Sequence, residues 1–149
     1  MGAALTQAPA LFRAVVSHVG IYDMLRVELD PNGVFNTTEF GTVKNPDEFR
    51  ALYAYSPYHQ VTEDTRYPAV LMITGEHDGR VNPMQSRKMV ARLQAADPKG
   101  TILLRTSSST GHGGIGASVK DAVALALDTT GFVLYELGVP LTQKARPGL

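Results

Sequence analysis

Short apolar segments alternate along this chain with longer amphipathic ones, and this alternation limits the possible folds more than any other feature. Apolar, β-branched runs predict buried strands over residues 12–19, 69–74 and 101–105. Strands separated by helices of ten residues or so form βαβ units, so we expect a parallel sheet in an α/β protein. The helices between and after the strands are expected over residues 46–54, 84–95 and 118–137.

The remaining segments predict less regular structure. Residues 1–8 suit a helix, but no Ser, Thr, Asp or Asn precedes them as a cap, so we expect the later part of a helix. Asp30-Pro31-Asn32-Gly33 predicts a turn inside a long irregular stretch that reaches about Lys44. We expect residues 1–138 to form part of one domain and residues 139–149 to form a disordered tail.

Composition excludes several classes of function. The 149 residues contain 14 Lys and Arg and 14 Asp and Glu, with no basic run of the kind that binds nucleic acid or an anionic membrane. The absence of cysteine excludes disulfides, thiolate zinc sites and cysteine nucleophiles. The four histidines lack the spacing of a metal site, so neither a metal nor another cofactor is expected.

Residue types that suit catalysis follow two consecutive predicted strands. Asp78 lies in the segment after the second strand, and His112 lies in the Ser- and Gly-rich segment after the third. Reacting groups gather at the carboxyl ends of parallel strands, so we expect these two side chains to be in contact. An Asp followed by a His matches the last two members of the Ser…Asp…His order of α/β-hydrolases. There the His accepts the proton of the nucleophile, and the Asp orients the His.

Each of these residues also has a structural interpretation. Asp78, beside a glycine, could organise a turn through bonds to the backbone, and His112 could be an exposed loop residue. We expect His77 to serve as a hydrogen-bonded scaffold residue, His18 to lie within the first strand, and His59 to lie in a surface loop.

A nucleophile is the missing member of this arrangement. The sequence contains no Gly-x-Ser-x-Gly, the turn that presents the serine of an α/β-hydrolase. Ser107, Ser108 and Ser109 are too close to His112 in sequence to occupy that turn. We expect the turn to precede the helix that begins at Met1.

Four motifs together resemble the catalytic domain of the prolyl oligopeptidase family of serine peptidases. They occur in order over nearly the whole chain: Phe12-Arg13-Ala14-Val15-Val16-Ser17-His18-Val19-Gly20-Ile21-Tyr22-Asp23-Met24-Leu25, Tyr55-Ser56-Pro57-Tyr58-His59, Gly75-Glu76-His77-Asp78-Gly79-Arg80-Val81 and Gly111-His112-Gly113. The resemblance implies the C-terminal portion of an α/β-hydrolase domain.

The resemblance also implies roles for individual residues. Asp78 is implied as the catalytic acid and His112 as the general base, and Arg80 is implied to bind a substrate carbonyl next to the cleaved bond. The residues implied to line the pocket for the substrate residue before that bond are Val81, Ile21 and Tyr55. Ala51 stands where well-known members have a tryptophan that stacks on a substrate proline, which implies a weaker proline preference.

We interpret the chain as part of a serine-type peptidase that hydrolyses short peptides. Its expected partners are a short peptide substrate and the upstream part of the same catalytic domain, without nucleic acid or membrane. Without the serine, the chain alone is expected to be inactive. Two alternatives remain open: an esterase or acyl-hydrolase of the same fold, and a non-catalytic interaction fragment.

Overall fold

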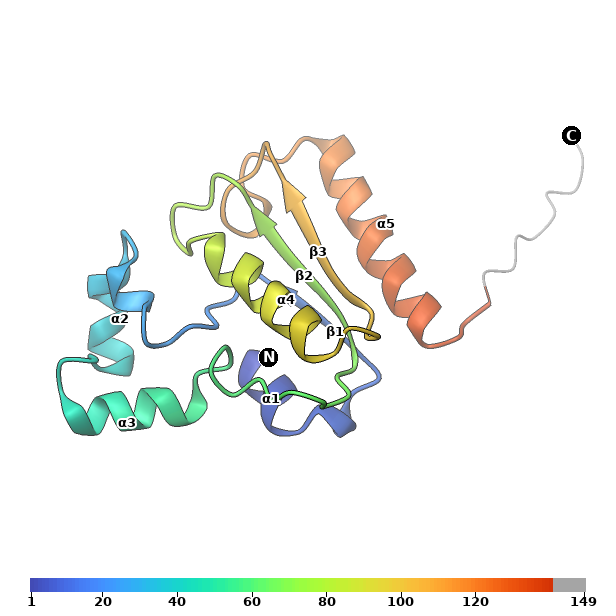
Figure 1. The fold of residues 1–149 in the computed structure, drawn as a ribbon. Helices are drawn as coiled ribbons and strands as arrows, with labels where there is room; N and C mark the ends of the chain where they lie inside the picture. Colours follow the sequence, from blue (N-terminus) through green and yellow to red (C-terminus); the bar gives the residue numbers. More distant parts are fainter. Residues whose placement is uncertain (141–149) are drawn as a thin grey trace, which may run out of the picture.

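A three-stranded parallel sheet forms the centre of the computed structural model, which describes residues 1–140. The strands are β1 (Ala14–His18), β2 (Ala69–Gly75) and β3 (Ile102–Ser107), and they lie side by side in the order β1-β2-β3 (Figure 1). In the register, Leu71 pairs with Val16 on one side and with Leu103 on the other. The predicted α/β fold with parallel strands is confirmed.

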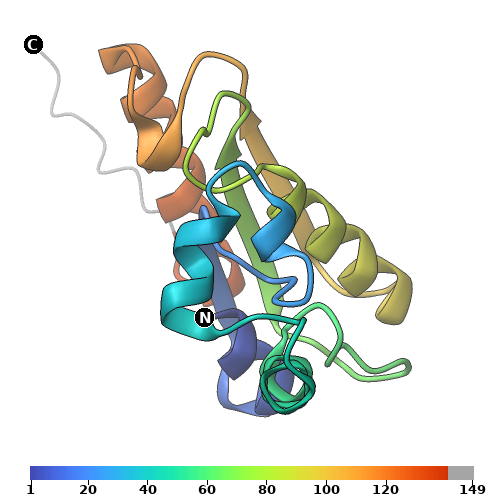
Figure 2. The same ribbon diagram turned by 90° about the vertical axis from the view of Figure 1, so that its left-hand side faces the viewer.

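Helices cover both faces of this sheet. Helix α4 (Met84–Ala96) packs on one face against β2 and β3, and α5 (Val119–Glu136) contacts β1 and β2 from the other (Figures 1 and 2). Every residue of β2 is buried, which explains its uninterrupted apolar sequence. The main core contains Leu5, Val15, Tyr22, Val61, Tyr67, Val70, Met72, Met89, Val90, Leu93, Ala96 and Ile102.

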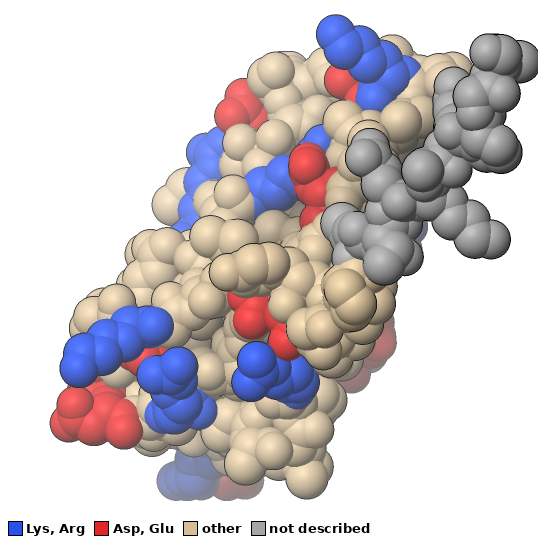
Figure 3. Space-filling view, turned by 90° about the vertical axis from the view of Figure 1, so that its right-hand side faces the viewer, with Lys and Arg blue, Asp and Glu red and all other residues tan. Residues whose placement is uncertain are grey.

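Helix α5 is less deeply packed than α4. None of its residues is fully buried, and Val119, Val123 and Leu127, spaced one turn apart, are exposed. On the side of the molecule that carries α5, Lys and Arg side chains lie close to Asp and Glu among uncharged surface (Figure 3). This mixture agrees with the balanced net charge of the chain.

Local sequence signals explain where the later helices begin. Helix α3 (Pro46–Tyr55) starts after Asn45, whose side chain accepts a hydrogen bond from the Asp47 N–H at 2.9 Å. Helix α5 starts after Ser118, which forms a reciprocal capping box with Asp121.

The stretch that was expected to be irregular contains two helical elements, so that expectation is wrong. A 3-10 turn, η2 (Val27–Leu29), precedes α2 (Gly33–Phe40). The predicted turn is present between them, closed by a 2.7 Å bond from the Gly33 N–H to the Asp30 carbonyl. A side chain at Gly33 would meet the backbone carbonyl of Glu28 at 2.3 Å, so glycine is required there. A second small core, Met24, Val27 and Leu52, joins this insertion to α3.

The chain begins with the short helix α1 (Gly2–Gln7), followed by the 3-10 turn η1 (Pro9–Leu11). As expected, α1 has no side-chain cap. Its Leu5 is 1% exposed and belongs to the main core, so the helix is anchored by packing rather than by capping. Of the expected C-terminal tail, residues 141–149 lie outside the described residues.

Candidate active site

The segments after β2 and β3 are joined by backbone hydrogen bonds. Gly75 pairs with Ser107 at the carboxyl ends of the two strands, and the Glu76 N–H donates to the Ser107 carbonyl at 2.8 Å. One residue further, the His77 N–H donates to the Thr110 carbonyl at 3.1 Å. These bonds bring the segment that contains Asp78 against the segment that contains His112.

Asp78 and His112 are in direct contact, as the position of the two strand ends predicts. His112 Nδ1 lies 2.9 Å from Asp78 Oδ2 and 3.2 Å from Oδ1. The Asp78 side chain is fully buried, whereas the His112 side chain is 28% exposed. An acceptor at Nδ1 favours a proton on that nitrogen, which leaves Nε2 to accept a proton from another group.

Asp78 also organises the turn that carries it. Its Oδ1 accepts hydrogen bonds from the backbone N–H groups of Arg80 and Val81, each at 2.9 Å. The structural and the catalytic interpretation of Asp78 are therefore compatible, because one carboxylate holds the turn and faces His112. These N–H bonds fix the orientation of the carboxylate.

His112 is presented by a tight, glycine-rich turn. It begins the 3-10 turn η3 (His112–Gly114), in which Gly113 and Gly114 have φ angles of 61° and 92°. The turn is closed by a 2.8 Å bond from the Gly111 N–H to the Ile115 carbonyl. Glycine is suited to the positive φ angles, which explains the composition of this segment.

Three of the four residues implied for substrate binding line one cavity of about 500 Å³. They are Ile21, Arg80 and Val81. The volume lies within the usual range of small-molecule sites, about 300–1,000 Å³. The other lining residues come from α2 and the turn before it: Asn32, Phe35, Asn36, Glu39 and Phe40.

Tyr55 lies next to this cavity rather than in its wall. It packs against the same small core as Ile21 and Phe40, which do line the cavity. Burial raises the pKa of the Tyr55 phenol, and the carboxylate of Glu39 raises it further. Ala51 is exposed on α3 and lies outside the lining of this cavity.

The three other histidines lie outside the Asp78–His112 pair. His18 ends β1 with an exposed side chain, and His77 is exposed and contributes its backbone N–H to the scaffold. His59 lies in the turn after α3, where its side chain is 18% exposed and lies 2.9 Å from Ser56 Oγ and 3.8 Å from Asp23. Burial lowers the pKa of His59 despite the neighbouring carboxylate.

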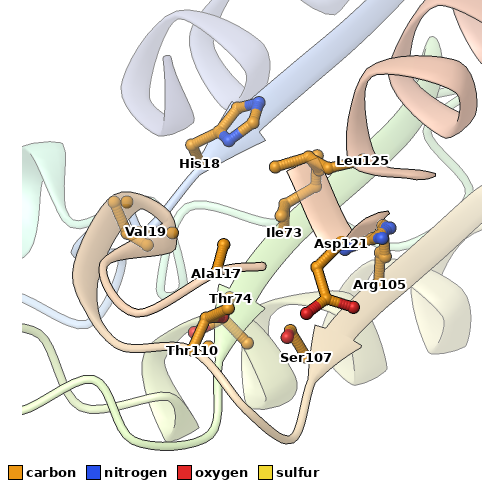
Figure 4. Close-up of a pocket in the computed structure, with 13 residues that line it drawn as sticks. His18, Val19, Ile73, Thr74, Arg105, Ser107, Thr110, Ala117, Asp121 and Leu125 are labelled. Carbon is orange, nitrogen blue, oxygen red and sulfur yellow. The ribbon is translucent and has the colours of Figure 1, made fainter. Parts of the chain in front are cut away.

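A second, much smaller cavity lies between the carboxyl ends of the strands and the start of α5 (Figure 4). His18, Thr74, Ser107 and Asp121 are among its lining residues, and its volume of about 30 Å³ holds a water molecule or two rather than a peptide. The Ser118 hydroxyl and backbone N–H lower the pKa of the Asp121 carboxyl, which is the cap interaction at the start of α5. The lining of this small cavity thus includes Asp121, which caps the start of α5.

Sequence reasoning missed the contribution of α2 to the large cavity. Phe35, Asn36, Glu39 and Phe40 lie in the stretch that was expected to be irregular. The aromatic residues Phe35 and Phe40 could have indicated a ligand-facing surface, but they are five residues apart in the sequence, which is not the spacing of one helix face.

Residues 1–140 contain neither a candidate membrane span nor a cluster of metal-binding side chains. No helix in this part is both long and apolar enough to cross a bilayer. No group of three or more His, Cys, Asp or Glu side chains in the same residues could hold a metal ion.

Comparison with protein families gives a match over almost the whole chain. The model of the prolyl oligopeptidase family (Peptidase_S9) matches residues 1–139. The prolyl endopeptidase of Elizabethkingia meningoseptica is 38% identical over 141 residues, which are 93% of this chain and 20% of that protein. The prolyl endopeptidase of Dictyostelium discoideum is 40% identical over 117 residues, 76% of this chain and 15% of that protein.

Solved structures give the same result. A structure from a study of two prolyl endopeptidases superposes with a TM-score of 0.89 at 44% identity, covering 93% of this chain and 20% of that one. Prolyl oligopeptidase B of Galerina marginata, bound to a 35-residue hydrolysis and macrocyclisation substrate, superposes with a TM-score of 0.88 at 33% identity. The match covers 95% of this chain and 20% of that one. The chain spans about a fifth of the length of the relatives that it matches.

Proposed function

Because this chain belongs to the prolyl oligopeptidase family, we propose that it supplies the acid, the base and part of the substrate pocket of a serine peptidase. Residues 1–138 are then part of an α/β-hydrolase catalytic domain whose nucleophilic serine lies in another part of that domain. The substrate is a short peptide. On its own, the chain is inactive.

The observation that carries this proposal is the contact between Asp78 and His112 at 2.9 Å. With Nδ1 bonded to Asp78, His112 Nε2 accepts the proton of the serine hydroxyl as its oxygen attacks the peptide carbonyl. Asp78 holds the ring in this orientation and stabilises the imidazolium that forms. The ring then gives the proton to the leaving amine, and water completes the hydrolysis of the acyl intermediate.

The cavity beside this pair supports a peptide as the substrate. Arg80 follows Asp78 by two residues and lines the cavity, where its guanidinium can donate to a carbonyl oxygen of the peptide. Ile21 and Val81 give the cavity apolar walls, and Tyr55 packs against the same small core as Ile21. An esterase of the same fold would use the same acid and base, but would not need an arginine for a second peptide carbonyl.

A hybrid enzyme tests the proposal. Residues 1–139 replace the matching segment of the Elizabethkingia meningoseptica prolyl endopeptidase, and hydrolysis of a short proline-containing peptide is measured. We expect a peptidase that loses about ten-thousand-fold in kcat on His112→Ala or Asp78→Asn. His77→Ala is the matched control, because the exposed His77 side chain lies outside the pair.

Three outcomes would contradict the proposal. A hybrid that unfolds as cooperatively as the parent enzyme but cleaves no peptide would indicate a non-catalytic fragment. A hybrid that hydrolyses activated esters and not peptides would indicate the esterase alternative. Retention of activity in His112→Ala would exclude His112 as the base.

A further inference from the structure

A turn far from His112 in sequence is hydrogen-bonded to the segment that carries Asp78. The turn is Asp30–Gly33, which connects η2 to α2, and the segment is residues 78–82, which connects β2 to α4. The two approach each other through side chains of the turn, across 47 to 55 residues of sequence. This contact joins the α2 insertion directly to the candidate active site.

Asp30 holds the far end of the 78–82 segment. Its Oδ1 accepts a 2.9 Å hydrogen bond from the side-chain amide of Asn82, and its Oδ2 accepts a 3.1 Å bond from the amide of Gln85. Asn82 in turn accepts from the Met84 N–H, at the start of α4. The Asp30 carboxylate therefore fixes the point at which the segment enters the helix.

Gln85 extends this connection to the segment after β1. It is 4% exposed, and its Oε1 accepts from the N–H groups of Tyr22 and Asp23 at 3.1 and 2.8 Å. Its amide NH₂ group donates to Asp30. A buried amide with its acceptor and donor both engaged has one favourable orientation, which makes Gln85 a rigid support for Asp30.

Asn32 holds the near end of the same segment. Its side-chain amide donates to the backbone carbonyl of Gly79, and it lies 3.4 Å from the carbonyl of Arg80. These two residues directly follow Asp78, whose Oδ1 accepts from the Arg80 N–H. The turn is therefore hydrogen-bonded to the segment on both sides of Arg80, at Gly79 and at Asn82, and makes no hydrogen bond to His112.

We propose that Asp30, together with Asn32, is a positioning residue that holds the Asp78 carboxylate against His112. This inference rests on the proposed function, in which that contact is catalytic. Small displacements of a catalytic group reduce the rate strongly, because about 1 Å can cost a hundredfold. Asp30 acts through Asn82 and Gln85 rather than on the substrate.

The test exchanges the donor and the acceptor of the Asp30–Gln85 hydrogen bond. In Asp30→Asn, the NH₂ group of the new residue faces the Gln85 NH₂ group, and the bond is lost. In the double variant Asp30→Asn/Gln85→Glu, the new asparagine donates to the new carboxylate, while its oxygen still accepts from Asn82. Asp47→Asn on the exposed start of α3 is the matched control for the same chemical change.

In the hybrid enzyme, Asp30→Asn should lower kcat about tenfold and change KM less than twofold, and the double variant should recover most of the loss. In the 149-residue chain with ¹⁵N-labelled histidine, Asp30→Asn should shift neutral His112 away from the Nδ1-protonated tautomer, and the double variant should restore it. Asp47→Asn should change neither readout.

The outcomes separate this inference from the proposed function. If Asp30→Asn leaves kcat and the His112 tautomer unchanged while His112→Ala abolishes activity, Asp30 does not position Asp78 and the proposed function stands. If Asp30→Asn removes the cooperative unfolding transition and the double variant does not restore it, Asp30 is a folding residue, and the inference is equally overturned. Retained activity in His112→Ala instead contradicts the proposed function.

Discussion

Replacement of Gly75 by alanine should separate the two segments of the candidate site. Gly75 ends β2, and a Cβ at this position would lie 2.3 Å from the Thr110 carbonyl oxygen and 2.6 Å from that of Gly111. Contacts of a Cβ atom below 3.0 Å essentially do not occur, so the segment before His112 has to retreat by about 0.7 Å. Both obstructing atoms belong to the backbone, which cannot rotate away as a flexible side chain would.

Overpacking of this kind typically costs about 1–3 kcal/mol. With an m-value of about 1–3 kcal/mol per molar urea, the unfolding midpoint of the 149-residue chain should fall by roughly 1 M. In the hybrid enzyme, a displacement approaching 1 Å at the base should lower kcat by about ten- to a hundredfold.

Gly79→Ala is the matched control, because a Cβ at Gly79 meets nothing within 4 Å and its φ angle is not in the positive range. This variant should keep the unfolding midpoint and kcat within experimental error. If Gly75→Ala behaves like Gly79→Ala, the approach of the two segments does not constrain the site, and the reasoning is refuted.

Three further predictions concern other parts of the chain. Asp23→Asn removes a fully buried carboxylate that accepts from Lys88, and should cost about 3–5 kcal/mol in urea unfolding. Burial raises the pKa of Asp23, but the Lys88 hydrogen bond and charge hold the pKa below its ordinary value of 3.8. The stabilisation by the charged Asp23 is therefore complete above about pH 3.8 and is lost as the pH falls through the pKa that Asp23 has in the folded state. The Asp23→Asn variant should not show this loss. Ser118→Ala removes the cap of α5 and should lower the free energy of unfolding by about 0.5–2 kcal/mol, measured in the same way. In the hybrid, Ala51→Trp should raise the proline-to-alanine ratio of kcat/KM by up to about tenfold, because a tryptophan at this position can stack on a substrate proline. Asn36→Leu, in the cavity wall, should change KM about fivefold.

Local patterns in the sequence were sufficient to predict the sheet and its flanking helices. Strand β2 is apolar throughout because both its faces are buried, and α3 begins where Asn45 and Pro46 predict a helix start. The contact of Asp78 with His112 was predictable from topology, since consecutive parallel strands end at the same edge of a sheet.

Features that depend on distant contacts were not predictable in this way. Helix α2 was missed because the turn signal Asp30–Gly33 runs directly into it, and Asn32, at its cap position, makes no side-chain cap bond. The Asn32 amide instead donates to the Gly79 carbonyl, 47 residues away, a contact that the local sequence does not reveal. The contact of His59 with Asp23 could not be predicted, because the two residues are 36 positions apart in the chain. The cavity of about 500 Å³ is partly lined by α2, and therefore it could not be assembled from the sequence.

The arrangement β2-α4-β3 has a consequence for how this site tolerates change. Asp78 and His112 follow the two strands of this single unit, which are direct neighbours in the sheet. The connection from α4 to β3, around Pro98 and Lys99, lies at the opposite end of the strands and is exposed. Lengthening that connection by several residues adds only a few tenths of a kcal/mol of closure entropy, roughly 0.6 kcal/mol for each doubling of loop length. Insertions there can therefore vary the far end of the molecule while the distance between Asp78 and His112 stays the same.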